Sequence, residues 1–180
     1  IGAINQIAKI NECGIQIRGR GKVIDFVLAK QKYEKLANLN HIPSIIKVIE
    51  CIPKLKISNG YTDLYRNNKE KYDKEIINWL IKLIELGRTE FTKQLIEKYY
   101  EVKDYENVIK EYSNDISIKN IYHESLFELI KLNNKEEYLK ILKSSNNKQI
   151  IFKTAKYFYD NRDFERAIDW FELVIDNNDA

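Results

Sequence analysis

Three cationic side chains alternate with glycine in the densest basic segment of this sequence, Ile-Gln-Ile-Arg-Gly-Arg-Gly-Lys over residues 15–22. Arg18 and Arg20 are two of only six arginines in a chain that carries 24 lysines, and Lys22 follows two residues later. Guanidinium groups bind phosphate bidentately, and glycine lets a ligand approach the backbone. Arg18, Arg20 and Lys22 are therefore candidates for contacting the phosphates of a nucleic acid. The competing interpretation is an edge strand that its charges protect from pairing.

Other residue types that do chemistry are few and scattered. Cys13, Cys51, His41 and His123 are the only cysteines and histidines, which is too few for a zinc pattern or a disulfide framework. Neither a P-loop nor a dinucleotide-binding glycine motif occurs. His123 and Ser125 lie two residues apart on a predicted helix and would point in different directions. We expect no catalytic site, no cofactor and no metal, and so a protein that is not an enzyme.

A helix, a strand and a second helix are predicted to position the three cations. Apolar residues recur at helical spacing over residues 1–13, and Gly14 ends this pattern. The alternation over residues 15–22 predicts a strand that would place Arg18, Arg20 and Lys22 on one face. A helical pattern returns over residues 23–39. Two prolines then bracket residues 45–52, whose apolar run is ambiguous between helix and strand.

This succession resembles the core of the Alba family of small archaeal-type nucleic-acid-binding proteins. The second strand of that family carries an Ile-x-Ile-Lys/Arg-x-x-Gly-Lys/Arg-x-Ile pattern and leads directly into its second helix. The resemblance covers residues 1–40 and at most residues 1–58. It implies a small α/β segment in which Arg18, Arg20 and Lys22 contact a nucleic-acid backbone. The rival interpretation is a further helical hairpin with Arg-Gly-Arg-Gly as its turn.

Charge is unevenly distributed along the 180 residues, of which 44% are apolar and 32% charged. Residues 1–58 carry ten Lys or Arg against four Asp or Glu, whereas residues 59–180 carry twenty against twenty-three. Such asymmetry suggests that the basic residues 1–58 bind a polyanion and that the nearly neutral residues 59–180 bind a protein partner. We therefore expect two domains, residues 1–58 and residues 59–180. The longest apolar stretch is too short and too interrupted to cross a membrane, so we expect a soluble, cytoplasmic protein.

Short antiparallel helices are predicted throughout residues 59–180, with no strand pattern among them. Gly87 stands where a glycine ends the first helix, and Thr89 and Asp104 stand where residues cap the next two. Similar segments begin near residues 72, 105, 135 and 164, which gives a period near thirty. A repeat of two helices at this period is typical of an α-solenoid.

Residues 151–175 resemble one tetratricopeptide (TPR) repeat. Small residues at Ala155 and Ala167 would let its paired helices approach closely. The apolar positions of this repeat are Ile151, Ala155 and Phe158 on its first helix and Phe164, Ala167, Ile168, Phe171 and Val174 on its second. The resemblance implies a mainly α, TPR-like solenoid of helix hairpins that binds a protein partner in its groove. The alternative is an irregular helical bundle without true repeats.

We expect a non-enzymatic binding protein. Its basic N-terminal segment would contact DNA or RNA through Arg18, Arg20 and Lys22, and its helical repeats would bind a protein partner. One alternative is a pure protein-interaction scaffold made entirely of helical repeats. Another is a regulatory region of a longer enzyme, because the sequence begins with Ile1 rather than methionine.

Overall fold

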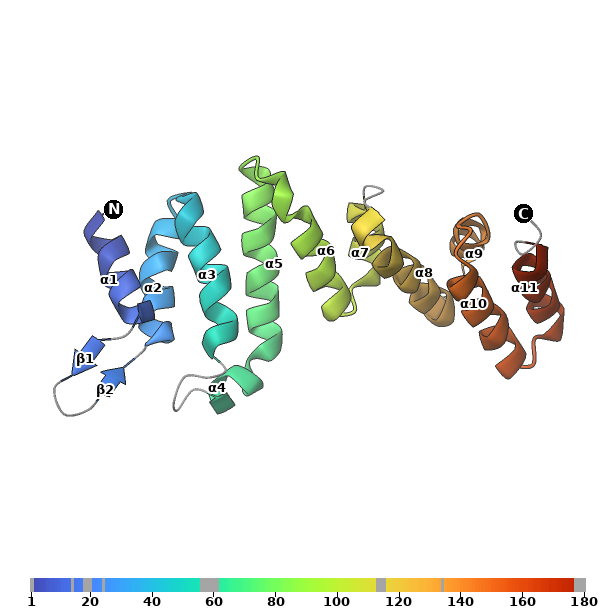
Figure 1. The fold of residues 1–180 in the computed structure, drawn as a ribbon, viewed down its shortest axis with the longest axis horizontal. Coiled ribbons are helices and arrows are strands. Elements are labelled where there is room, and N and C mark those ends of the chain that lie inside the picture. The colour runs from blue at the N-terminus through green and yellow to red at the C-terminus, as the bar shows by residue number, and fades with distance from the viewer. Residues whose placement is uncertain are drawn as a thin grey trace. The chain divides into compact units, whose positions relative to one another are not determined.

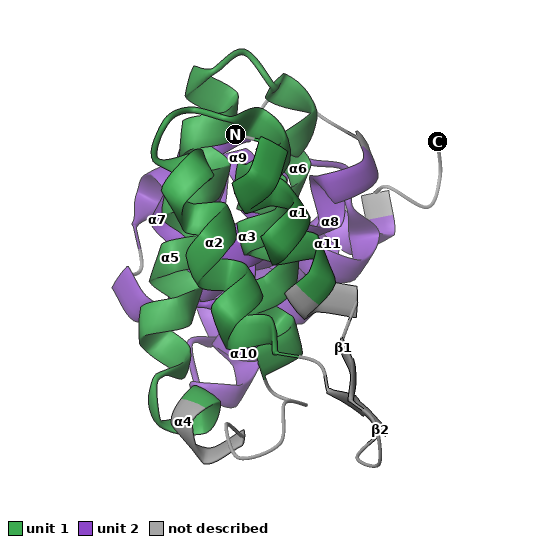
Figure 2. Cartoon of the chain, turned by 90° about the vertical axis from the view of Figure 1, so that its left-hand side faces the viewer, with its two compact units in different colours: residues 1–95 green, residues 96–180 purple. Residues whose placement is uncertain are grey.

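The computed structural model describes residues 2–13, 15–17, 21–23, 25–55, 62–112, 116–133 and 135–176, and it is mainly α-helical, as the sequence predicts. The chain folds as two compact units, unit 1 over residues 1–95 and unit 2 over residues 96–180 (Figure 2). Helices that precede and follow residues 58–59 in the sequence pack against each other inside unit 1. The expected division into domains of residues 1–58 and residues 59–180 stays a prediction.

Unit 1 contains one β-hairpin, and most of its helices lie side by side (Figure 1). Its elements are α1 (Gly2–Cys13), β1 (Ile15–Ile17), β2 (Gly21–Val23), α2 (Phe26–Ala37), α3 (Ile42–Lys54), α4 (Thr62–Asn67), α5 (Lys69–Glu85) and the 3₁₀ helix η2 (Thr89–Phe91). Helix α6 (Thr92–Glu101) runs across the boundary into unit 2.

The core of unit 1 lies where α2, α3 and α5 pack together. The ambiguous run over residues 45–52 is helical, because its buried residues Ile45, Val48, Ile49 and Ile52 recur at helical spacing. Proline is tolerated in the first turn of α3, where a backbone N–H has no helical partner. Leu80 and Leu83 of α5 are also fully buried. These contacts hold α2 and α5 on either side of α3.

Two short strands stand in place of the single strand predicted over residues 15–22. β1 and β2 pair antiparallel, with Gln16 opposite Lys22 and Ile17 opposite Gly21. Because the two strands run in opposite directions, Lys22 does not continue the strand that contains Ile17. The premise that one strand carries Arg18, Arg20 and Lys22 on one face is therefore wrong. The resemblance of this segment to the Alba family stays a prediction.

Unit 2 is built from helices that begin close to the predicted positions. They are α7 (Tyr105–Glu111), the 3₁₀ helix η3 (Ile116–Ile118), α8 (Lys119–Asn133), α9 (Glu136–Lys143), α10 (Lys148–Asp160) and α11 (Phe164–Asp176). The capping role predicted for Asp104 is confirmed, since its side chain accepts a hydrogen bond from the backbone N–H of Asn107 at 3.4 Å. That these helices form TPR-like repeats stays a prediction.

Four helices in the two units end with the same backbone geometry. A residue with positive φ closes each helix, and the next N–H donates to the carbonyl five residues earlier. The positive-φ residues are Asn40, Gly87, Lys103 and Arg162. In two of these turns the donating residue, Asp104 or Asp163, also caps the following helix. The turn therefore ends one helix and begins the next without a separate linker.

The core of unit 2 contains the two small residues singled out by the repeat pattern. Ala155 and Ala167 are both buried, in one cluster with Phe158 and Trp170. The rest of the pattern on α11 is only partly followed, because Phe164 and Ile168 are exposed. Among the described residues, no helix is long and apolar enough to cross a bilayer.

Candidate binding groove

The structure leaves the predicted cationic site largely untested. Arg18 and Arg20 lie outside the described residues, and Lys22 is placed only as a backbone position of β2. Their proposed contact with nucleic acid stays a prediction.

His123 and Ser125 do not approach each other as a base and a nucleophile would. Ser125 Oγ donates to the carbonyl of Ile121 at 2.8 Å, inside its own helix. His123 Nδ1 lies 2.9 Å from Asn147 Nδ2, and Asn147 caps α10 by accepting from the N–H of Ile150. Both residues are buried and take part in helix packing and capping.

Two adjoining clefts line α5 in unit 1 and share Glu75 and Asn78. The larger has a volume of about 650 Å³, and the smaller, of about 390 Å³, also takes residues from α2. We call them together the α2–α5 groove. Its lining residues are Glu34 and Asn38 from α2 and Asn67, Asn68, Glu70, Lys71, Lys74, Glu75, Asn78, Trp79 and Lys82 from α4, α5 and the turn between them.

One buried ammonium joins the two walls of the groove. Lys30 Nζ of α2 lies 2.7 Å from Glu34 Oε1 of the same helix and 2.7 Å from Glu75 Oε1 of α5. The three side chains are only 12%, 29% and 20% exposed. This shared cation links α2 to α5 beside the smaller cleft, which Glu34 and Glu75 both line.

Burial and proximity perturb both partners of this ion pair. Burial alone disfavours the Lys30 ammonium, but hydrogen bonds to Glu34 and Glu75 outweigh it and raise the pKa of Lys30. Burial raises the pKa of Glu34, and nearby Glu75 adds to this while Lys30 opposes it. The groove therefore contains a carboxyl group, that of Glu34, which accepts a proton more readily than an exposed glutamate does.

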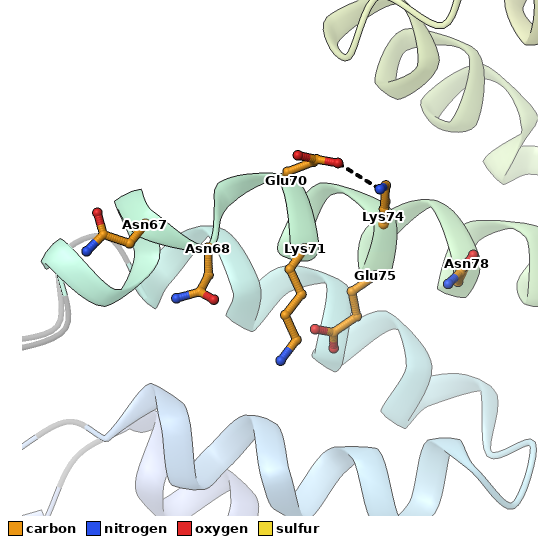
Figure 3. Close-up of a pocket in the computed structure, with 7 residues that line it drawn as sticks. All are labelled: Asn67, Asn68, Glu70, Lys71, Lys74, Glu75 and Asn78. Carbon is orange, nitrogen blue, oxygen red and sulfur yellow. Dashed lines mark hydrogen bonds and ion pairs between the residues drawn. The ribbon is translucent and has the colours of Figure 1, made fainter.

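The charged side chains of the α5 wall project to two sides of the helix (Figure 3). Lys71 and Glu75 point toward α2, whereas Glu70 and Lys74 pair with each other at 2.7 Å on the outer side (Figure 3). Farther along, Lys82 lies over the ring of Trp79, with 5.4 Å between Nζ and the ring centroid. The groove thus offers both signs of charge and one aromatic surface.

Asparagine is the most frequent residue type in the lining of the groove, at four positions. Asn38 comes from the α2 side, and Asn67, Asn68 and Asn78 come from the α5 side. Each carboxamide supplies two donors and one acceptor, so it can pair with both the N–H and the C=O of a peptide group. Amides on both walls suit a ligand whose own donors and acceptors alternate along its length.

The sequence contains a weak signal for this groove, which lies outside the motifs that predicted the cationic site. Residues 71, 74, 75, 78 and 82 share one face of a helix, opposite the apolar face used to predict it. A polar face of this kind is typical of any solvated helix, so spacing alone does not distinguish a groove wall. The partner wall comes from α2, which is far away in the sequence.

Comparison with known protein families finds no match to this chain, and comparison with curated proteins finds none either.

Proposed function

We propose that this protein is a non-enzymatic binding protein that holds an extended segment of a partner protein in the α2–α5 groove. The observation that carries the proposal is the presence of carboxamides on both walls of a groove whose two helices, α2 and α5, are linked by the Lys30 ion pair. An extended peptide exposes N–H and C=O groups on alternating sides, and side-chain amides can satisfy both kinds. Lys71 and Lys82 would add contacts to acidic or aromatic side chains of the partner.

A display library of random peptides, selected against the full chain, supplies the ligand for the test. Selected peptides should bind Asn78→Ala or Asn38→Ala at least about tenfold more weakly than the native chain, because each replacement leaves peptide groups unpaired. Asn5→Ala, at an exposed position of α1, is the matched control and should bind unchanged. Calorimetric titration measures the affinities. Selected peptides that bind all four proteins equally would contradict the proposal.

Contact with nucleic acid through Arg18, Arg20 and Lys22 is a second candidate function. Its support is the charge of unit 1, which carries seventeen Lys or Arg against ten Asp or Glu, whereas unit 2 carries thirteen against seventeen. Cations that neutralise phosphates release counterions, so binding must weaken as salt rises.

Titration with duplex DNA and with single-stranded RNA over a range of salt concentrations tests this candidate. Replacing Arg18 and Arg20 together should weaken binding across unrelated sequences and flatten the logarithmic salt slope by about 1 for each phosphate that is no longer neutralised. Replacing Lys140 and Lys143, which are exposed in unit 2, is the matched control. Equal losses from both double variants, or no measurable affinity at low salt, would exclude the role of this segment.

A further inference from the structure

An apolar surface in unit 2 lacks any covering element among the described residues. Helix α11 buries Ala167 and Trp170 on the side that packs against the core, yet a second apolar stripe runs along an adjacent side. The stripe consists of Phe164, Ile168, Phe171 and Ile175, spaced four, three and four residues apart. Phe164, Ile168 and Ile175 are 54%, 57% and 61% exposed.

Two aromatic side chains of α10 extend this stripe. The ring of Tyr159 lies 5.6 Å from that of Phe164, and the ring of Phe152 lies 5.7 Å from that of Phe171, both in edge-on contact. Phe152 and Tyr159 are themselves exposed. We call the six residues the α10–α11 surface. Single exposed apolar residues are ordinary, but five exposed ones around the half-buried Phe171, in one patch on two packed helices, are typical of an interaction site.

Acidic residues border the stripe on α11. A row of three exposed carboxylates runs beside the stripe, on the side away from Ala167 and Trp170. It consists of Glu165, Asp169 and Glu172, spaced four and three residues apart. Among the described residues, none of the three forms an ion pair. The one cation of α11, Arg166, instead pairs with Asp163 and lies over the ring of Phe158, with 4.4 Å from Cζ to the ring centroid. One edge of the surface is therefore uniformly negative.

We propose that the α10–α11 surface docks one amphipathic helix of a partner protein, whose apolar face is bordered by lysine or arginine. A stripe with four- and three-residue spacing matches the side chains that a facing helix presents at the same spacing. The acidic edge of α11 selects a helix with cations beside its apolar face and repels one with carboxylates there. This site lies in unit 2 and is distinct from the α2–α5 groove.

Two synthetic helices provide the probe. Both have about 18 residues, enough for five turns, with leucine along one face. Lysine borders the leucines in the first peptide and glutamate borders them in the second. Fluorescence anisotropy of each labelled peptide against the full chain, at low and at high salt, measures the affinities. The native chain should bind the lysine-bordered helix at least about tenfold more tightly at low salt, and added salt should reduce this preference.

Variants of exposed residues assign this binding to the surface without disturbing the core. Ile168→Asp should weaken binding of the lysine-bordered helix by at least about tenfold, because it places a carboxylate in the centre of the stripe. Replacing Glu165, Asp169 and Glu172 together with lysine should reverse the preference between the two peptides. Leu132→Asp is the matched control, since Leu132 is an exposed apolar residue of α8 outside the stripe. Thermal unfolding by circular dichroism verifies that each variant is folded.

Three results would overturn the proposal. The first is equal or undetectable binding of the two peptides by the native chain. The second is concentration-dependent self-association, measured by sedimentation, that Ile168→Asp abolishes, because a second copy would then occupy the surface. The third is binding to vesicles of phosphatidylserine and phosphatidylcholine that depends on Ile168. Failure here leaves the α2–α5 groove unaffected, because its test uses different variants and a different ligand.

Discussion

Replacing Lys30 with methionine tests whether one buried cation fixes the two walls of the α2–α5 groove. Methionine keeps much of the apolar stem but removes the ammonium that lies 2.7 Å from both Glu34 Oε1 and Glu75 Oε1. The two carboxylates then face each other across α2 and α5 without a shared cation. The folded state should become less stable.

The exposure of the three side chains sets the expected magnitude. Exposed ion pairs contribute about 0–1 kcal/mol, whereas removing one partner of a fully buried pair costs about 3–5 kcal/mol. Lys30, Glu34 and Glu75 are mostly but not fully buried, at 12%, 29% and 20% exposed. We therefore expect Lys30→Met to lower the free energy of unfolding by about 2 kcal/mol near neutral pH.

The pH dependence distinguishes this explanation from a simple loss of packing. The pKa of Glu34 is raised, so the stability linked to this group is present below its ordinary pKa and lost as the pH rises through the raised value. Without Lys30, no cation offsets the effect of the Glu75 carboxylate on Glu34. The stability that is lost when Glu34 becomes ionised should therefore increase. The penalty of Lys30→Met should therefore shrink at about pH 4, where glutamates become protonated. In the native chain, the contribution of Lys30 should persist until the pH rises through its own raised pKa.

Urea unfolding followed by circular dichroism measures both effects. Lys74→Met is the matched control, because Lys74 and Glu70 form an ion pair of the same length with side chains that are 72% and 85% exposed. This control should change the free energy of unfolding by less than about 0.5 kcal/mol. Equal losses from both variants, or a Lys30→Met penalty that is the same at both pH values, would refute the reasoning.

Two further predictions concern unit 2. Ala167→Leu should lower the free energy of unfolding by about 1–3 kcal/mol, because it overpacks the core shared by α10 and α11; a melting temperature equal to that of the native chain would contradict this packing. Ala3→Leu, the same change at an exposed position of α1, should cost less than about 0.5 kcal/mol. Burial, with a smaller effect from nearby Lys119, lowers the pKa of His123, so its contribution to stability is present above the ordinary histidine pKa and lost as the pH falls. The free energy of unfolding should therefore decrease as the pH is lowered below about 6.5. His123→Gln, whose side-chain carbonyl can still accept a hydrogen bond from Asn147, should make this decrease smaller. An unchanged pH profile would show that protonation of His123 does not weaken the fold.

The positions of most helices could be predicted from the sequence, because short-range interactions determine them. Helical spacing of apolar residues marked α5, α8, α10 and α11, and the capping residues Gly87 and Asp104 marked where helices end or begin. Each of these signals involves residues within one or two helical turns of one another. The N-terminal segment was harder to predict, because the alternation over residues 15–22 fits both one continued strand and the two paired strands of a hairpin.

The candidate site and the exposed surface depended on contacts that no local pattern specifies. Helix α11 carries apolar residues on two adjacent sides, and only its packing against α10 decides that Ala167 is buried while Ile168 stays exposed. The groove likewise requires α3 to bring Lys30 and Glu75 together from distant parts of the chain. For most helices, though not for the ambiguous run over residues 45–52, the sequence alone determined which residues are helical and which helix face is apolar. Only the tertiary structure decided which of those faces meet, because that choice depends on side-chain shape and ion pairing between segments far apart along the chain.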